Sequence, residues 1–95
     1  MKQPCAYMLA SRRNGTIYVG VTADVIARVL QHRAGTADGF TKQHAVTRLV
    51  WFELHETIAQ AISREKAIKG WRRAWKIELI EARNPYWLDL YPGLL

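Results

Sequence analysis

Cysteine, acidic side chains and long apolar runs are all scarce in this sequence. Its only cysteine, Cys5, can form no internal disulfide and no zinc site of its own, which is typical of proteins in a reducing cytosol. The apolar run near the N-terminus is too short for a signal peptide, and Pro4 interrupts its start. No stretch approaches the roughly 18 apolar residues of a membrane span. We therefore expect a soluble protein of the cytoplasm.

The eight acidic residues are outnumbered by fourteen lysines and arginines, which gives a formal net charge of +6. Proteins this basic often bind polyanions, above all nucleic acids. The alternative is a soluble surface that happens to be basic. The chain length of 95 residues suits one domain, so we expect a single domain over residues 1–95.

Hydrophobic periodicity and turn residues divide the chain into strands and helices. The expected strands cover residues 5–10, 16–22 and 48–56, and the expected helices cover residues 25–33, 57–69 and 71–83. Asp24 can cap the first helix and Gly35 can end it, whereas residues 35–47 are predicted to form a polar, mobile loop. The order β-β-α-β-α-α predicts an α+β domain in which helices flank a small sheet.

Two of these helices carry a clear apolar stripe, which we expect to face the core. The stripes comprise Val25, Ile26, Val29 and Leu30 on the first helix, and Trp71, Trp75 and Leu79 on the last.

The first two strands bring two tyrosines to one face of the expected hairpin. An Asn-Gly dipeptide between them favours a two-residue turn, which would place Tyr18 opposite Ser11 and Thr22 opposite Tyr7. Because side chains alternate along a strand, both phenols then share a face with Gly20 between them. The alternative is that both tyrosines are core residues with tethered hydroxyl groups.

The first helix carries polar residues at a spacing of one turn. Asp24, Arg28 and His32 lie along one helical face. They could form a solvated stripe with an Asp24–Arg28 ion pair, which would contribute little to stability. Alternatively, Arg28 could bind a phosphate through its planar guanidinium group.

A carboxylate interrupts the apolar stripe of the second helix. Glu65 is spaced so as to share a face with Ile58, Ala61, Ile62 and Ile68. Burying it unpaired would cost several kcal/mol, so it needs a cation, a basic side chain or water. One carboxylate with open positions suits Mg²⁺, which keeps most of its waters. The alternative is a structural salt bridge, for example to Arg28.

Basic residues cluster around this carboxylate. Between residues 64 and 76 the chain places Arg64, Lys66, Lys69, Arg72, Arg73 and Lys76, interleaved with Trp71 and Trp75. Clusters of this kind contact phosphates in nucleic-acid complexes, and Lys42 of the expected loop is a further candidate for such a contact. A solvated helical face is the alternative, but the run has one sign apart from Glu65, which favours nucleic-acid binding.

Taken together, these residues resemble the GIY-YIG nuclease superfamily, and most closely its small, stand-alone bacterial members. The tripeptide CAY at 5–7 stands at the family's first motif, and YVG at 18–20 stands at the second. VIARVLQH at 25–32 matches the helix that carries the family's arginine and histidine. The segment 64–90 is similar to the C-terminal half of the stand-alone group. The resemblance thus covers nearly the whole chain.

The resemblance implies a small, mainly antiparallel three-stranded sheet flanked by helices. It also implies a divalent-metal-dependent endonuclease, with Mg²⁺ or Mn²⁺, that hydrolyses DNA phosphodiester bonds in repair or processing. Tyr18 would orient or deprotonate the attacking water, and Tyr7 would form a hydrogen bond beside it. Arg28 would neutralise charge on the phosphorane, and His32 would position the nucleophile or the phosphate.

The resemblance also implies that Glu65 holds one metal ion near the leaving oxygen and that Asn84 supports the site. Some members have a further basic residue after the first helix, and either Lys42 or His44 could fill that place. A free phenol, with a pKa near 10, is a poor base at neutral pH. A nearby cation, such as Arg28, Lys42 or the metal, would lower that pKa.

Two other functions are compatible with the sequence. The chain could be a nucleic-acid-binding module whose nuclease activity is weak or vestigial, or a protein-interaction domain whose basic face meets an acidic partner. So small a chain lacks the separate DNA-binding module of larger nucleases. It is therefore expected to be weakly specific, to recognise a DNA shape or to depend on a protein partner.

Overall fold

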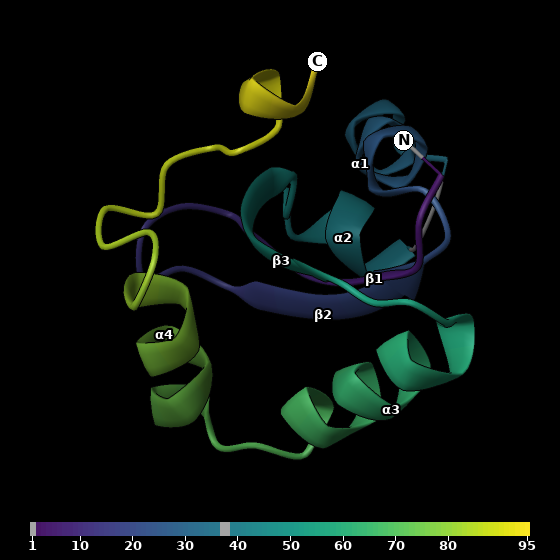
Figure 1. Cartoon of the computed structure of the whole chain (residues 1–95). Helices are drawn as coiled ribbons and strands as arrows, with labels where there is room; N and C mark the ends of the chain where they lie inside the picture. The colour runs from purple at the N-terminus through teal and green to yellow at the C-terminus, as the bar shows by residue number, and fades with distance from the viewer. Residues whose placement is uncertain (1, 37–38) are drawn as a thin grey trace.

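Three antiparallel strands lie between two layers of helices in this computed structural model, which describes residues 2–36 and 39–95 (Figure 1). The strands are β1 (Cys5–Ala10), β2 (Ile17–Thr22) and β3 (Arg48–Leu54), in the spatial order β2-β1-β3. The helices are α1 (Val25–Ala34), α2 (Gly39–Gln43), α3 (Ile58–Lys69), α4 (Arg73–Glu81) and a final 3₁₀ turn, Pro92–Leu94. The α+β class is confirmed, and the predicted strands and helices occur in the predicted order with one additional short helix, α2, and the final turn.

The short helix α2 was not expected, because the polar segment 35–47 was predicted to be a loop. Its one buried side chain, Thr41, gives no apolar stripe that a sequence pattern could reveal. Residues 37 and 38 of the predicted loop lie outside the described residues. None of the helices in the described part of the chain is long and apolar enough to cross a membrane.

The turn of the hairpin is longer than the expected two residues. A backbone hydrogen bond of 3.1 Å joins Ser11 to Thr16, so the turn comprises residues 12–15. Asn14 adopts a φ of 58°, a conformation that asparagine tolerates better than most residues. Arg73 of α4 donates hydrogen bonds to the last two carbonyls of the turn. This long-range contact could not be read from the local Asn-Gly pattern.

The longer turn shifts the register of the hairpin by two residues from the one expected. Tyr18 lies opposite Leu9, and Tyr7 lies opposite Gly20. The predicted register is therefore wrong, but the predicted face is correct. Because side chains alternate with a period of two, a shift of two residues leaves each one on its original face.

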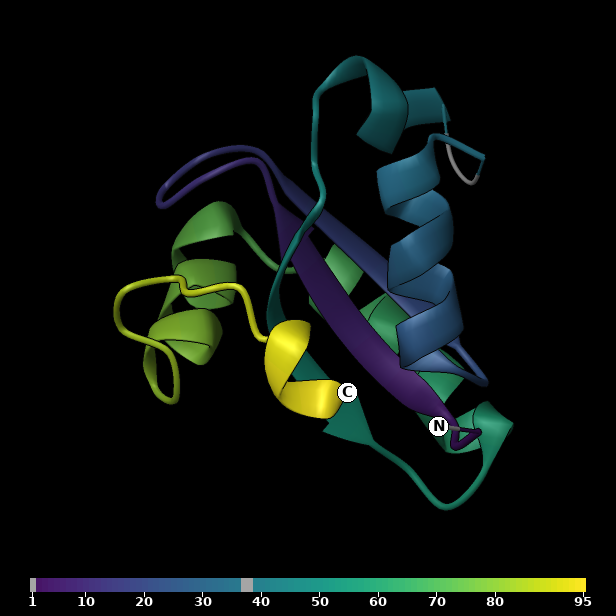
Figure 2. The same cartoon turned by 90° about the horizontal axis from the view of Figure 1, so that it is seen from above.

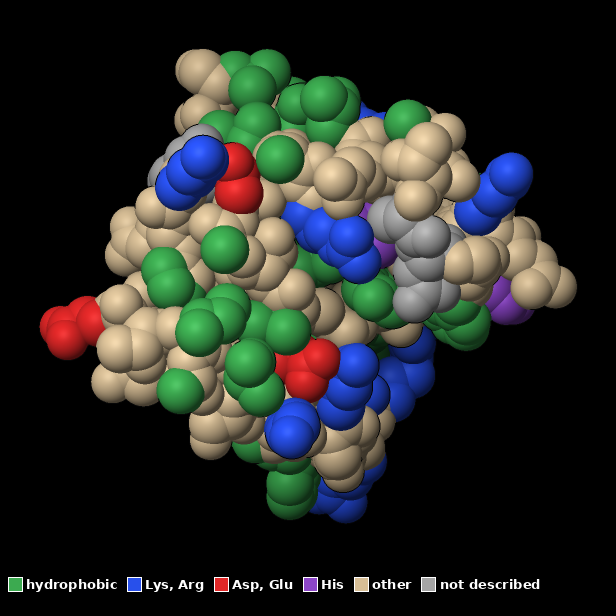
Figure 3. Space-filling model, turned by 90° about the vertical axis from the view of Figure 1, so that its right-hand side faces the viewer, with side chains coloured by type: hydrophobic (Ala, Val, Ile, Leu, Met, Phe, Trp, Pro, Cys, Tyr) green, Lys and Arg blue, Asp and Glu red, His purple; other side chains and the backbone are tan. Residues whose placement is uncertain are grey.

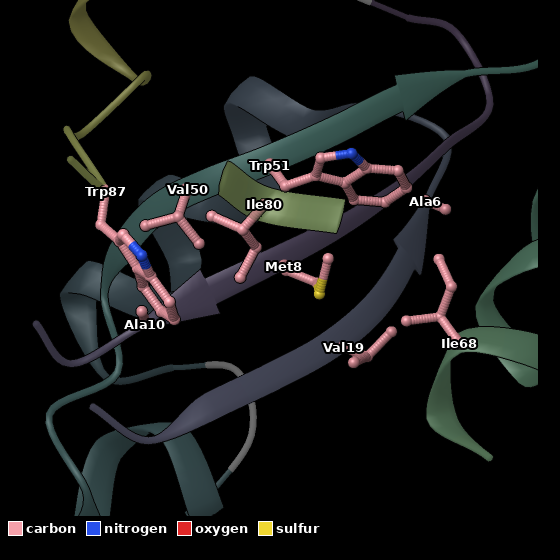
Figure 4. Close-up of a cluster of buried hydrophobic side chains, with 9 residues drawn as sticks. All are labelled: Ala6, Met8, Ala10, Val19, Val50, Trp51, Ile68, Ile80 and Trp87. Carbon is pink, nitrogen blue, oxygen red and sulfur yellow. The ribbon is translucent and has the colours of Figure 1, made fainter. Parts of the chain in front are cut away.

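The sheet has a hydrophobic core on each side, since β1 is central and buried throughout. On one face, α3 and α4 cover the cluster of Ala6, Met8, Ala10, Val19, Val50, Trp51, Ile68, Ile80 and Trp87 (Figure 4). On the other face, α1 and the C-terminal segment cover Cys5, Tyr7, Leu9, Val25, Val29, Val46 and Leu49. Figures 1 and 2 show α1 over one face and α3 under the other.

The helix boundaries follow the predicted caps, but the buried stripes differ. Asp24 accepts a hydrogen bond from the backbone of Ala27, and Gly35 ends α1 with a φ of 73°. The buried side chains of α1 are Val25, Val29 and His32. Leu30 was expected in this stripe but is 55% exposed. The polar His32 occupies the core position instead.

The expected apolar stripe of the last helix faces the core only in part. It begins at Arg73 rather than at residue 71, and Ile77 and Ile80 contact the core. Trp75, expected to face inward, is 46% exposed. Trp71 and Leu79 of the expected stripe are partly buried and pack against the core, so only Trp75 departs from the prediction.

The hydrogen bonds from Arg73 of α4 to the hairpin turn, called the Arg73 clamp below, predict an effect on stability. Arg73 donates to the carbonyls of Asn14 and Gly15 at 2.8 and 2.7 Å. Hydrogen bonds to a charged donor stabilise more than neutral ones, so Arg73→Gln should lower the free energy of unfolding by about 1–2 kcal/mol. Urea unfolding measures this loss. Arg83→Gln, on an exposed arginine, is the matched control, and an equal loss in both variants would contradict the clamp.

Candidate active site

Four of the predicted catalytic side chains meet on the α1 face of the sheet. The hydroxyl of Tyr7 lies 2.9 Å from Nε2 of His32. The Tyr18 ring lies 6.3 Å from the Tyr7 ring and 5.3 Å from the His32 ring, measured between centroids. Arg28 interacts with both phenols. One strand pair and one helix therefore bring together residues from three separate motifs of the sequence.

The position of the Tyr7 ring depends on the absence of a side chain at Gly20. A Cβ atom added to Gly20 would lie 2.5 Å from both Cζ and Oη of Tyr7. No such contact is tolerated in a folded protein, so only glycine lets the phenol cross the neighbouring strand. Because β2 is an edge strand, the Tyr7 hydroxyl is directed toward that edge of the sheet.

The Tyr7 phenol is held in its neutral form. Burial raises its pKa from 10.0 to about 12, and the hydrogen bond and positive charge of Arg28 only partly offset this effect. The expected lowering of a phenol pKa by a cation is therefore outweighed at Tyr7. At neutral pH this residue can donate a hydrogen bond but cannot act as a base.

His32 is fixed through both of its ring nitrogens. Its Nε2 contacts Tyr7, and its Nδ1 lies 2.9 Å from Oγ1 of Thr41 in α2. His32 and Thr41 are each only 1% exposed. Both hydroxyl groups can donate or accept, so either neutral tautomer completes the chain. His32 is thus a buried part of the site rather than a member of a solvated stripe. Sequence patterns did not single out Thr41, because α2 was predicted to be part of a loop.

Arg28 lies at the half-buried rim of this cluster. One guanidinium nitrogen donates to the side chain of Gln31 at 3.0 Å. Its hydrogen bond to Tyr7 raises its pKa, so the group stays charged at every physiological pH. The expected partner Asp24 instead caps α1 by accepting from the backbone of Ala27. This hydrogen bond lowers the pKa of the Asp24 carboxyl.

Helix α2 adds an aromatic side chain that the sequence analysis did not single out. The Phe40 ring lies 6.3 Å from the Tyr18 ring and 4.5 Å from the His44 ring, between centroids. His44 is thereby connected to the site. Lys42 lies instead near the end of α1, since a Cβ at Gly35 would meet its side chain at 3.5 Å. The choice between Lys42 and His44 as a further basic residue stays open.

Glu65 reaches the sheet from the opposite face. It is 8% exposed and lies on the buried side of α3 with Ala61 and Ile68, as its spacing predicted. The expected neighbours Ile58 and Ile62 are exposed. The ion pair of Glu65 is with Lys69, at 3.0 Å, and not with Arg28.

The helix that carries Glu65 packs against β2 and β1. It therefore passes beneath the edge strand that Tyr7 crosses on the other face. Figure 3 shows one side of the molecule, where Lys and Arg side chains flank an acidic one at the level of α3. Above them, further Lys or Arg atoms lie beside a partly covered histidine.

The donor chemistry of Glu65 fits one kind of metal ion. Within residues 2–36 and 39–95, no group of three or more His, Cys, Asp and Glu side chains is placed to enclose a metal. A site built wholly from protein ligands, as zinc requires, is not found there. A single carboxylate at the rim of a core suits Mg²⁺, which keeps several of its waters.

Asn84 serves the C-terminal segment in this structure. Its amide nitrogen donates to the carbonyls of Val50 and Leu88, and its amide oxygen accepts from the backbone of Leu88. These contacts lie on β3, at the edge of the sheet away from β2. A supporting role of Asn84 in the site stays a prediction.

The basic residues predicted to bind nucleic acid divide into two groups. Arg64 pairs with Glu53 at 3.0 Å, and Arg73 clamps the hairpin. Both therefore have structural partners. The remaining members are Lys42, Lys66, Lys69, Arg72 and Lys76, of which Lys69 also pairs with Glu65.

Comparison with known proteins assigns this fold to a family. The model of the GIY-YIG catalytic domain matches residues 3–78, so the chain belongs to the GIY-YIG nuclease family, whose members act on nucleic acid. The match includes Tyr7, Tyr18, Arg28, His32 and Glu65 and ends before Asn84.

Within that family, the chain is similar to small bacterial proteins named UPF0213, as the sequence resemblance predicted. It is 39% identical over 70 residues to the UPF0213 protein of Staphylococcus aureus strain Mu3, an alignment that covers 74% of this chain and 85% of that protein. The same values hold for the relative from strain NCTC 8325. The solution NMR structure of UPF0213 protein BH0048 from Bacillus halodurans superposes with a TM-score of 0.54, at 26% identity over 86% of each chain.

The contact between Gly20 and Tyr7 predicts the effect of one added methyl group. Gly20→Ala should displace the phenol, break its hydrogen bond to His32 and destabilise the fold by about 1–3 kcal/mol. Urea unfolding and the NMR signals of the imidazole report the two effects. Gly93→Ala is the control, because a Cβ there meets nothing within 4 Å. An unchanged imidazole signal in Gly20→Ala would contradict the arrangement.

The raised pKa of Tyr7 predicts a loss of stability at alkaline pH. The folded state keeps the phenolic proton up to about pH 12, whereas an unfolded tyrosine loses it near pH 10. The unfolded state therefore binds fewer protons between these values, and stability falls as the pH rises, by about 2–3 kcal/mol in total. Tyr7→Phe should remove this slope.

The measurement is urea unfolding at about pH 9 and about pH 12. Both proteins should carry Cys5→Ala, because burial also raises the pKa of the Cys5 thiol, to about 11. If the free energy of unfolding fell equally with pH in the proteins with and without the Tyr7→Phe substitution, Tyr7 would ionise as readily in the folded chain as in the unfolded chain.

Proposed function

We propose that this chain is an Mg²⁺-dependent endonuclease that hydrolyses phosphodiester bonds in DNA, in repair or processing. The observation that carries the proposal is the Tyr7–His32–Thr41 chain of contacts, closed by Arg28 and adjacent to the ring of Tyr18. A histidine and a tyrosine buried together stabilise a fold less well than apolar residues of the same size would. A catalytic role at this site would explain why these two polar side chains are buried next to the Arg28 guanidinium.

Each side chain has a role that follows from its surroundings. Tyr7 is locked in its neutral form, so it donates a hydrogen bond and holds the site's geometry. Tyr18 is only partly buried and lies between Phe40 and His32, where it can orient the attacking water. The two phenols therefore have different roles: Tyr7 positions the side chains of the site, and Tyr18 acts on the attacking water.

Arg28 supplies the positive charge that the reaction needs. Hydrolysis of a phosphodiester places additional negative charge on the non-bridging oxygens in the transition state. A guanidinium group can donate two parallel hydrogen bonds to those oxygens. Fixed donors of this kind contribute about 10²- to 10³-fold each to the rate in related acyl-transfer sites.

Glu65 is the residue that would hold the metal ion. When bound there, Mg²⁺ supplies Lewis-acid stabilisation of the leaving oxygen. Lys69, which pairs with Glu65 at 3.0 Å, then becomes available to contact a phosphate of the substrate. The positive charge of this part of α3 favours the approach of DNA in either state.

Cleavage assays with purified protein test the proposal. The substrates are labelled duplex, single-stranded, branched and flapped DNA and RNA, each with Mg²⁺, Mn²⁺ or EDTA. We expect metal-dependent cutting of DNA, and a fall of about 100-fold or more in Tyr18→Phe, Arg28→Ala and Glu65→Gln. Binding, measured in EDTA, should change much less in Tyr18→Phe and Glu65→Gln.

Tyr86→Phe and Arg83→Ala are matched controls, because both residues are exposed and far from the cluster in sequence. Activity that survives unchanged in all three site variants would indicate a contaminating nuclease. Intact DNA binding without cleavage of any substrate would identify the chain as a nucleic-acid-binding module instead.

A further inference from the structure

A surface pocket of about 520 Å³ lies along α4, outside the cluster of catalytic side chains. Its walls are Trp71, Trp75, Glu78, Leu79 and Ala82. Trp71 packs against the core, whereas nearly half of Trp75 is exposed to solvent. This volume is within the range of pockets that hold small aromatic ligands. Neither the proposed catalytic roles nor the predicted phosphate contacts assign an occupant to this pocket.

The indole rings of Trp71 and Trp75 provide a stacking surface for one base at a time, because the two rings are nearly perpendicular and share no common plane. The indole rings of Trp71 and Trp75 meet edge to face, with centroids 6.1 Å apart and an interplanar angle of 82°. The Arg72 guanidinium lies 4.7 Å from the centroid of the Trp75 ring. An open indole face stacks on the flat face of an unpaired base, whatever the sequence, and a neighbouring arginine adds a cation–π contribution.

The charged residues near the pocket favour phosphates outside it and bases inside it. Lys69, Arg72 and Lys76 lie on the adjoining turns of α3 and α4 and can contact a phosphate backbone. Glu78, in the wall, repels phosphate but can accept hydrogen bonds from the amino groups of bases. A second copy of this chain would bring the same positive charges together, which disfavours a dimer through this face.

The pocket also continues a path from the candidate metal site. Glu65 and Lys69 occupy the last turns of α3, and Trp71 follows directly after its end. A strand that leaves Glu65 along these basic side chains reaches the stacking surface next. Bases paired in a duplex present no free faces to it, so only an unpaired segment can use the pocket.

We propose that the α4 pocket binds unpaired bases of single-stranded DNA, so that the substrate class is DNA with a single-stranded segment beside a duplex. This inference rests on the proposed action on DNA and adds the structure that is recognised.

Binding in EDTA tests the inference without cleavage. The probes are a fluorescently labelled oligothymidylate and a duplex of the same length, with the full chain. Trp75→Ala should weaken binding of the oligothymidylate by about 5- to 100-fold and leave duplex binding within about twofold. Trp75→Phe, which keeps a stacking ring, should retain most of the affinity.

Tyr86→Ala is the matched control. Tyr86 is also an exposed aromatic ring beside an arginine, with Arg13 at 5.5 Å from its centroid, but it does not line the pocket. Its loss should affect neither probe. Circular dichroism confirms that each variant is folded.

Two results would overturn the inference. One is an equal effect, or no effect, of Trp75→Ala on the two probes. The other is a dimer in solution that Trp75→Ala dissociates, since the pocket would then be an interface between copies. Failure of the proposed nuclease activity is distinguishable, because a protein that cuts nothing but binds oligothymidylate through Trp75 refutes only the cleavage.

Discussion

The contact between the Tyr7 hydroxyl and the His32 imidazole connects the parts of this molecule on which its site depends. It joins the central strand to α1, and through Thr41 it extends to α2. Neither partner could be buried alone at low free-energy cost, because an unsatisfied polar group in a core is destabilising. Gly20 gives the phenol its space, and the Arg28 charge closes the cluster on its solvent side. The site is therefore part of the core and not an addition to the surface.

Much of this site was predictable from the sequence because period-two alternation tolerates an error of two residues. The hairpin turn was misjudged, yet Tyr7 and Tyr18 share the predicted face. The inward position of Glu65 followed from helical spacing, although two of the isoleucines used to infer it are exposed. The contribution of α2 was not predictable, since its only buried residue is a threonine whose partner is an imidazole of another helix.

The orientation of α4 shows a different limit. Three apolar residues at helical spacing predicted the inward face, but tryptophan is large enough to be partly buried and partly exposed at once. Ile77 and Ile80 contact the core together with Trp71 and Leu79, and Arg73 bonds to the distant hairpin turn. Such a long-range contact leaves no trace in a local pattern. Trp75 is the one member of the predicted stripe that lies at the surface.

The position of Tyr7 on the central strand also bears on local unfolding. β1 is hydrogen-bonded on both sides and has no exposed residue, so its amide protons should exchange only when the whole domain unfolds. α2 spans five residues and buries one side chain, and it can open in isolation at far smaller free energy. The two ends of the Tyr7–His32–Thr41 chain therefore belong to regions of unequal stability. Tyr7 is therefore expected to stay in place until the whole domain unfolds, whereas Thr41 can lose and regain its contact with the imidazole by local opening of α2.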